Sequence, residues 1–153
     1  MPDKQQNTED IDVRLVQTPS DFEGAKKLRF KVFVEEQGVP FKEETDQFDI
    51  VASHAVAVKS WQIVGTGRMF VDPSGEAKIG RMAVQSELRG SGIGSRILNV
   101  LEQHARETGC ESVTVNAQSY VAEFYGNHGY IAQGEPFMEV GIEHLRMTKA
   151  LNS

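Results

Sequence analysis

Hydrophobic positions change between two periods along the chain, which predicts strands interleaved with helices. Apolar and polar residues alternate from Ile11 to Val16, a pattern typical of a half-buried strand. Beyond it the apolar positions adopt helical spacing, and Ser20 with Glu23 forms the sequence pattern of a capping box at a helix start. We expect this helix to end before Gly38 and Pro40.

The rest of the chain continues this alternation. The acidic stretch 41–50 is predicted to form a loop, and turns are predicted near Ser60 and within 72–77. Apolar residues at helical spacing predict a helix that starts near Ile93 and is closed by Gly109. Further strands are predicted at 51–59, 61–70, 78–84, 112–116, 130–134 and 142–151, and a short helix at 119–129.

This order of elements predicts one mixed α/β domain over residues 11–153, preceded by a flexible polar segment at 1–10. The net charge of −6 argues against nucleic-acid binding, and no apolar run approaches the roughly 20 residues of a membrane span. Because Cys110 is the only cysteine, no internal disulfide can form, which suits a reducing compartment. We therefore expect a cytoplasmic protein that has neither nucleic acid nor membrane as a partner.

The segment Leu88–Leu98, LRGSGIGSRIL, places three glycines at every second position directly before a predicted helix. Glycines let backbone N–H groups converge on a ligand, and the start of the helix adds unpaired N–H groups and partial positive charge. In an acidic protein this local pattern predicts a phosphate or diphosphate site, with Arg89 supplying a formal charge. The Walker pattern is absent, and the dinucleotide fingerprint fails at Ser95, where its third glycine is required.

The sequence around this turn resembles the acetyl-CoA signature of the GCN5-related N-acetyltransferases (GNAT), [Q/R]-x-x-G-x-[G/A]. Arg89, Gly92 and Gly94 hold its motif positions. The later segment AEFYGNHGY resembles the second block of the family, A-x-x-Y-x-x-x-G-[F/Y], with Tyr125 at its tyrosine position. Two more segments, RFKVFVEEQGVP and GEPFMEVGIEHLRM, resemble a bacterial subgroup similar to the ElaA and YjcF proteins.

The resemblance implies both a fold and a cofactor. Family members have a mixed central sheet flanked by helices, in which two parallel strands splay apart and the pantetheine arm of acetyl-CoA enters the gap. These strands correspond here to Lys78–Gln85 and Ser112–Asn116. Many family members have an asparagine where this chain has Ser119, so Asn116 is the alternative contact for the arm. The implied cofactor-binding residues are Met82 and Val84, through their backbone, and Arg89, Gly90, Gly92, Gly94, Ser95 and Asn116.

The resemblance further implies transfer of an acetyl group from acetyl-CoA to a primary amine by direct attack in a ternary complex. Tyr125 corresponds to the usual proton donor to the departing thiolate. Candidates for the base or for the acceptor end of the site are Glu36, at the end of the first predicted helix, and His144, five residues after Glu139. The acceptor stays open between a small amine, an antibiotic, an amino acid and a peptide or protein lysine. Homodimers are common among proteins of this resemblance.

Two other classes of function stay open. A binding module that senses acyl-CoA without turning it over needs the glycine-rich turn but neither Tyr125 nor a base. A nucleotide-binding oxidoreductase of the Rossmann type is disfavoured by Ser95 and by the late position of the turn. A metal site is not expected, because the sequence has no HxxxH or CxxC spacing.

The acidic run within 41–50 has two interpretations. Its carboxylates can form a solvated loop, or they can attract a cationic acceptor through their combined potential. These carboxylates are Glu43, Glu44, Asp46 and Asp49. Arg81, in the predicted cofactor strand, is expected to pair with a buried carboxylate.

Overall fold

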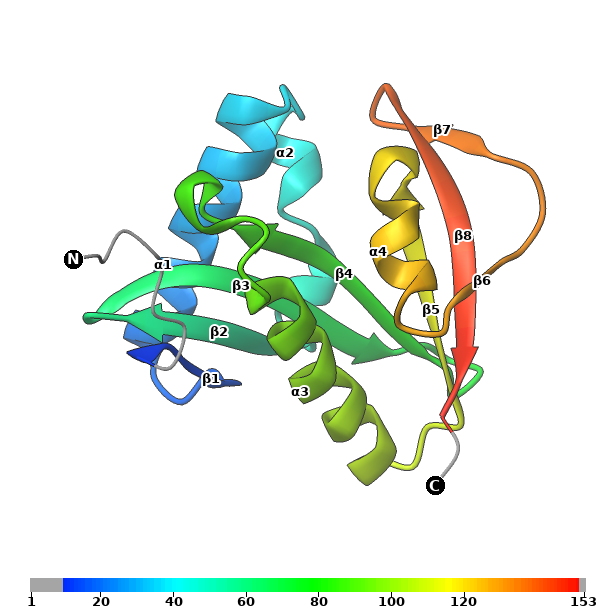
Figure 1. Cartoon of the computed structure of the whole chain (residues 1–153), viewed down its shortest axis with the longest axis horizontal. Helices are drawn as coiled ribbons and strands as arrows, with labels where there is room; N and C mark the ends of the chain where they lie inside the picture. The colour runs from blue at the N-terminus through cyan, green and yellow to red at the C-terminus, as the bar shows by residue number, and fades with distance from the viewer. Residues whose placement is uncertain (1–9, 152–153) are drawn as a thin grey trace.

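A mixed sheet runs through the computed structural model, which describes residues 10–151 (Figure 1). The strand order is β1-β2-β3-β4-β5-β8-β6, with β7 also paired to β8. The β4–β5 pair is parallel and the other neighbours are antiparallel, which confirms the predicted mixed sheet. The strands are β1 (Asp12–Leu15), β2 (Ser53–Lys59), β3 (Gln62–Val71), β4 (Ala77–Val84), β5 (Ser112–Gln118), β6 (Ile131–Ala132), β7 (Phe137–Glu139) and β8 (Ile142–Ala150).

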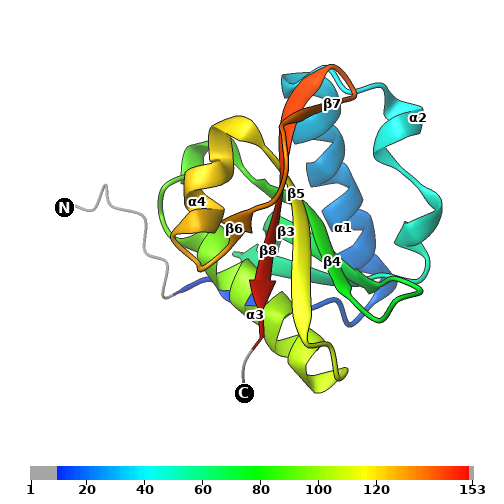
Figure 2. The same cartoon turned by 90° about the vertical axis from the view of Figure 1, so that its right-hand side faces the viewer.

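Helices cover both faces of the sheet (Figures 1 and 2). Helix α1 packs on one face of β2–β4 and helix α3 on the other. The α-helices are α1 (Pro19–Arg29), α2 (Phe41–Glu44), α3 (Ile93–Glu107) and α4 (Ala122–Gly126), and a π-helical segment, Phe30–Glu36, extends α1. No helix of this described region is long and apolar enough to cross a membrane.

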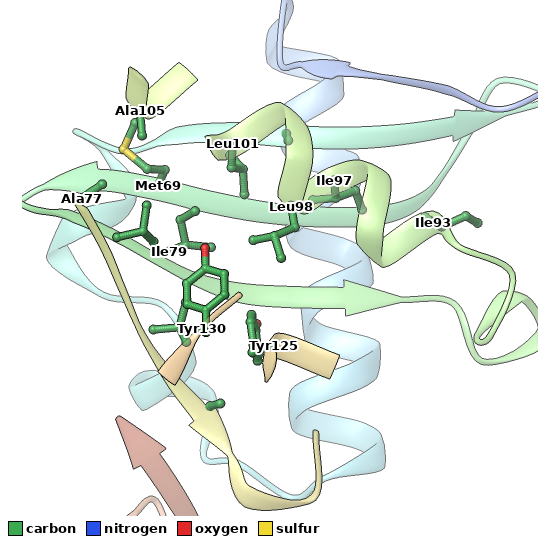
Figure 3. Close-up of a cluster of buried hydrophobic side chains, with 14 of the residues drawn as sticks. Met69, Ala77, Ile79, Ile93, Ile97, Leu98, Leu101, Ala105, Tyr125 and Tyr130 are labelled. Carbon is green, nitrogen blue, oxygen red and sulfur yellow. The ribbon is translucent and has the colours of Figure 1, made fainter. Parts of the chain in front are cut away.

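The larger core forms under α3, where the predicted apolar stripe is buried. Ile93, Ile97, Leu101 and Ala105 recur every fourth residue and each is at most 1% exposed. These side chains belong to one cluster with Met69 of β3, Ile79 of β4 and Tyr125, part of which Figure 3 shows. A smaller cluster, Leu28, Val32, Phe33, Val39 and Ala83, fills the opposite face under α1.

Local sequence signals placed some element boundaries incorrectly. Helix α1 begins at Pro19 rather than after Ser20, because the Thr18 side chain accepts a hydrogen bond from the Asp21 N–H at 3.1 Å. The stretch 41–50, predicted as a loop, contains α2 and a 3-10 turn at Gln47–Asp49. No sequence pattern predicted strand β7. The predicted segment 1–10 lies outside the described residues except for Asp10.

Three of the four carboxylates of the acidic run, Glu44, Asp46 and Asp49, lie in ion pairs, whereas Glu43 is exposed. Glu44 and Asp49 are 4% and 7% exposed. Arg29 pairs with both of them, and Arg68 pairs with Asp49 at 2.8 Å. A group of three arginines and three carboxylates thus forms the buried charge cluster: Arg29, Arg68, Arg81, Glu44, Asp46 and Asp49.

Arg81 belongs to the cluster, which confirms its predicted structural role. Its guanidinium donates to the Glu44 carbonyl oxygen at 3.0 Å and to Asp46 at 3.2 Å. Its backbone adopts a positive φ of 54°, at a bulge where the register between β3 and β4 shifts. A bulge bends a strand, so the cluster holds β4 in its bent course.

We predict that Asp49→Asn lowers the free energy of unfolding by about 3–5 kcal/mol at neutral pH, because it leaves a buried arginine charge uncompensated. Burial disfavours the charged carboxyl, but Arg29 and Arg68 outweigh burial and lower its pKa to about 2. The stabilisation is therefore present above pH 4 and is lost as the pH falls to about 2, since the unfolded state binds the proton more readily.

Urea unfolding of wild type and variant across this pH range measures the effect. Asp12→Asn is the matched control, because Asp12 forms an exposed pair with Arg14 and should contribute less than about 1 kcal/mol. Equal losses in the two variants contradict the prediction.

Candidate active site

Strands β4 and β5 separate along part of their length. Their parallel register begins at Ala77–Val113 and ends at Ile79–Val115. Beyond this point the two strands diverge, as Figure 1 shows. The sheet therefore has an opening at its centre, lined by backbone on both sides.

The backbone of Met82 and Val84 faces this opening. The Gln85 N–H donates to the Val64 carbonyl oxygen on β3 at 2.8 Å. Because successive residues of a strand direct their backbone groups to opposite edges, Ala83 also faces β3, while Met82 and Val84 face the opening. The backbone groups on this edge can pair with an extended ligand, although the Val84 carbonyl oxygen also accepts from Arg89 Nε at 2.8 Å.

The glycine-rich turn presents free amides at the edge of the same opening. Gly90 and Gly92 have φ values of 83° and 92°, a left-handed conformation that favours glycine. The first hydrogen bond of the following helix runs from the Arg96 N–H to the Gly92 carbonyl oxygen. The amides of the first helical turn precede this bond and are available to an anion, assisted by the helix dipole.

A second contact supports this turn. The Ser95 hydroxyl lies 2.9 Å from His128 Nε2, and a Cβ added at Gly94 would lie 3.5 Å from the Phe124 ring. Phe124 and His128 come from α4 and the turn after it, so α4 is fixed against the start of α3.

A cavity of about 1330 Å³ connects these features. Its walls come from β4, β5, the start of α3, α4 and the β7–β8 hairpin. The structure thus brings together ten of the eleven site residues named from the sequence: Met82, Val84, Arg89, Gly90, Gly92, Gly94, Ser95, Asn116, Tyr125 and His144.

Tyr125 lies in the wall of this cavity and is 6% exposed. Its ring packs edge-on against Phe124 and Tyr130. Burial raises the pKa of its hydroxyl above the usual value near 10. The phenol therefore stays protonated at neutral pH and can donate a proton.

His144 reaches the cavity from β8 and is 6% exposed. Its Nδ1 lies 2.7 Å from the Ile142 carbonyl oxygen, which can only accept, so Nδ1 carries the proton. In the neutral ring Nε2 is then the basic nitrogen. The ring also stacks on Phe137, which fixes its orientation.

Glu36 lies outside the cavity, unlike the other site residues named from the sequence. Its carboxylate pairs with Arg89 Nη2 at 2.7 Å. Arg89 also donates from Nε to the Val84 carbonyl oxygen at 2.8 Å. Both Glu36 and the charge of Arg89 are therefore engaged with protein groups, and the sequence indicated neither contact.

The cavity residues that the sequence analysis did not name as site residues include Gln37, Gln118 and Tyr120. The Gln118 amide donates to Gln37 at 2.8 Å, and Gln37 donates to the Tyr120 hydroxyl at 3.1 Å. These bonds link the end of the π-helical segment to β5 across the opening. No local pattern signals them, because more than 80 positions separate Gln37 from its partners.

Comparison with known proteins identifies the family of this chain. The acetyltransferase (GNAT) domain model matches residues 20–151. The chain is 36% identical over 123 residues to the Bacillus subtilis protein named "Uncharacterized N-acetyltransferase YjcF", covering 80% of this chain and 87% of that protein.

Two solved structures share the fold. An acyl-CoA N-acyltransferase from Pseudomonas aeruginosa has a TM-score of 0.82 and 29% identity, covering 92% of this chain and 99% of the other. Escherichia coli ElaA has a TM-score of 0.82 at 24% identity, with 91% and 99% covered, a likeness that shows the fold alone.

The chain belongs to the GNAT acetyltransferase family and is a GNAT N-acetyltransferase, EC 2.3.1.-. The family uses acyl-CoA and acts on amine acceptors. Within residues 10–151 no group of three or more His, Cys, Asp or Glu side chains is placed to hold a metal ion.

Proposed function

We propose that this protein transfers an acetyl group from acetyl-CoA to a primary amine, with both substrates bound in the cavity between β4 and β5. The observation that carries the proposal is the single cavity that joins the amide-lined turn to Tyr125 and His144. The diphosphate binds the amides at the start of α3, and the pantetheine arm pairs with the backbone of Met82 and Val84. Asn116, on the facing strand, lines the path of the arm.

The amine attacks the thioester carbonyl directly. His144 Nε2 first takes one proton from the ammonium group, which frees the nitrogen lone pair. The nitrogen then forms the amide bond as the C–S bond breaks, and the second proton that it loses restores the phenol of Tyr125. The protonated phenol of Tyr125 donates a proton to the departing thiolate. Holding both reactants side by side supplies much of the rate increase, and a Met82 N–H aimed at the carbonyl oxygen stabilises the developing charge.

We further propose that the acceptor is a small-molecule or peptide amine, and that the protein is a homodimer located in the cytoplasm. Arg89 acts by holding the turn against the Val84 carbonyl oxygen.

An assay for consumption of the thioester in the presence of an amine distinguishes the proposed enzyme from an acyl-CoA sensor, which binds the thioester without turnover.

We predict that Gly94→Val weakens coenzyme A binding by at least about tenfold, because the side chain crowds the amides that face the diphosphate. Isothermal titration calorimetry with coenzyme A measures the change. Gly126→Val is the matched control, since a Cβ there meets no atom within 4 Å and Gly126 lies outside the cavity wall. Unchanged affinity in folded Gly94→Val removes the turn from the binding site.

We predict that Tyr125→Phe lowers kcat about 10- to 100-fold, the low end of general-acid effects, because a thiolate already leaves well. Steady-state thioester assays measure it, with KM for acetyl-CoA little changed. Tyr130→Phe is the control: it loses a hydrogen bond to buried Glu102 and should lower thermal stability rather than kcat. Full activity of Tyr125→Phe excludes the hydroxyl from the reaction.

We predict that His144→Asn lowers kcat/KM for the amine about 100-fold, because it removes the base. Asparagine can keep the hydrogen bond to the Ile142 carbonyl oxygen but has no basic nitrogen. Glu36→Gln should change kcat less than about fivefold, because Glu36 lies outside the cavity and its pair with Arg89 is exposed. A larger loss in Glu36→Gln than in His144→Asn assigns the base to Glu36.

A further inference from the structure

The positive side chains that line the cavity are all paired with protein carboxylates. Arg68 pairs with Asp46 at 2.6 Å, and Arg81 pairs with the same carboxylate at 3.2 Å. Lys78 lies 3.4 Å from Glu76, and Arg89 pairs with a carboxylate outside the cavity. The cavity of residues 10–151 therefore offers no unpaired cation to an anionic acceptor.

Two lining carboxylates have no ion-pair partner among the described residues, Glu43 and Glu139. They come from α2 and from the end of β7. Figures 1 and 2 place α2 and the β7–β8 hairpin at the same end of the molecule, where β4 and β5 are farthest apart. The net charge that this end of the cavity presents to a ligand is negative.

His144 gives independent evidence about the ligand that binds at this end of the cavity. It is more than nine-tenths buried, and its Nδ1 is taken by the Ile142 carbonyl oxygen. Nε2 has no protein partner among the described residues and lines the cavity as a hydrogen-bond acceptor. An acceptor nitrogen in such a place can accept a hydrogen bond from a ligand, and a protonated amine is such a donor.

We propose that the acceptor is an amine with a second positive charge, whose distal cation is held by Glu139 and Glu43 while its reacting ammonium faces His144. This inference rests on the proposed acetyl transfer. Acceptors with a distal carboxylate, such as amino acids, are repelled by the same two side chains. Of the four carboxylates in the acidic run, Glu44, Asp46 and Asp49 are paired with arginines. Selection of a cationic acceptor therefore depends on Glu43 and on Glu139, which lies 96 positions further along the chain.

Three substrates of equal chain length test this proposal: cadaverine, pentylamine and ω-aminovalerate carry a positive, neutral and negative distal group. We expect kcat/KM to fall in that order, with cadaverine about five- to tenfold above pentylamine at low ionic strength. The preference should shrink in high salt, because the carboxylates are exposed. If none of the amines consumes the thioester, acetyl transfer itself is contradicted. Equal rates, or ω-aminovalerate as the best substrate, overturn only the charge selection.

Variants in the β7–β8 hairpin test whether Glu139 causes the preference for a cationic acceptor. Glu139→Gln should lower the cadaverine-to-pentylamine ratio about threefold, and Glu139→Lys should raise ω-aminovalerate relative to cadaverine. Glu143→Gln, in the same hairpin but outside the cavity wall, removes an equal charge and should keep the wild-type ratio. The same change in Glu143→Gln and Glu139→Gln indicates overall charge and overturns the assignment.

Discussion

The separation of β4 from β5 beyond Ile79 and Val115 is the constraint on which the rest of the site depends. Neighbouring parallel strands satisfy each other's backbone groups, and unpaired groups inside a protein cost free energy unless another partner binds them. Here the backbone of Met82 and Val84 is turned to an opening and not to a strand. The fold therefore keeps a strand-shaped site for an extended ligand.

The buried charge cluster keeps this opening in place. Arg81 sits at the bulge of β4 with a positive φ, a conformation that costs free energy for a residue with a Cβ. Its guanidinium is anchored to the segment between α2 and β2, which Arg29 and Arg68 hold in turn. Stability and site geometry thus depend on the same charges, which explains why Glu44 and Asp49 are buried.

Charge is distributed unevenly along the cavity. At the start of α3 an anion is met by backbone amides and a helix dipole, because Arg89 is occupied by Glu36. At the opposite end the unpaired groups are carboxylates and the basic nitrogen of His144. An acidic protein can therefore bind a highly negative cofactor at one end and favour cationic acceptors at the other.

The sequence by itself determined the features that depend on neighbouring residues: the buried stripe of α3, the glycine-rich turn and the tyrosine of α4. Periodicity and glycine conformation are local properties, so a pattern reveals them. Only the tertiary structure decided that Glu36 pairs with Arg89, that His144 turns an unpaired Nε2 to the cavity, and that arginines form ion pairs with most of the acidic run. Each of these depends on which distant side chain a carboxylate or imidazole meets, and chain spacing carries no information about that.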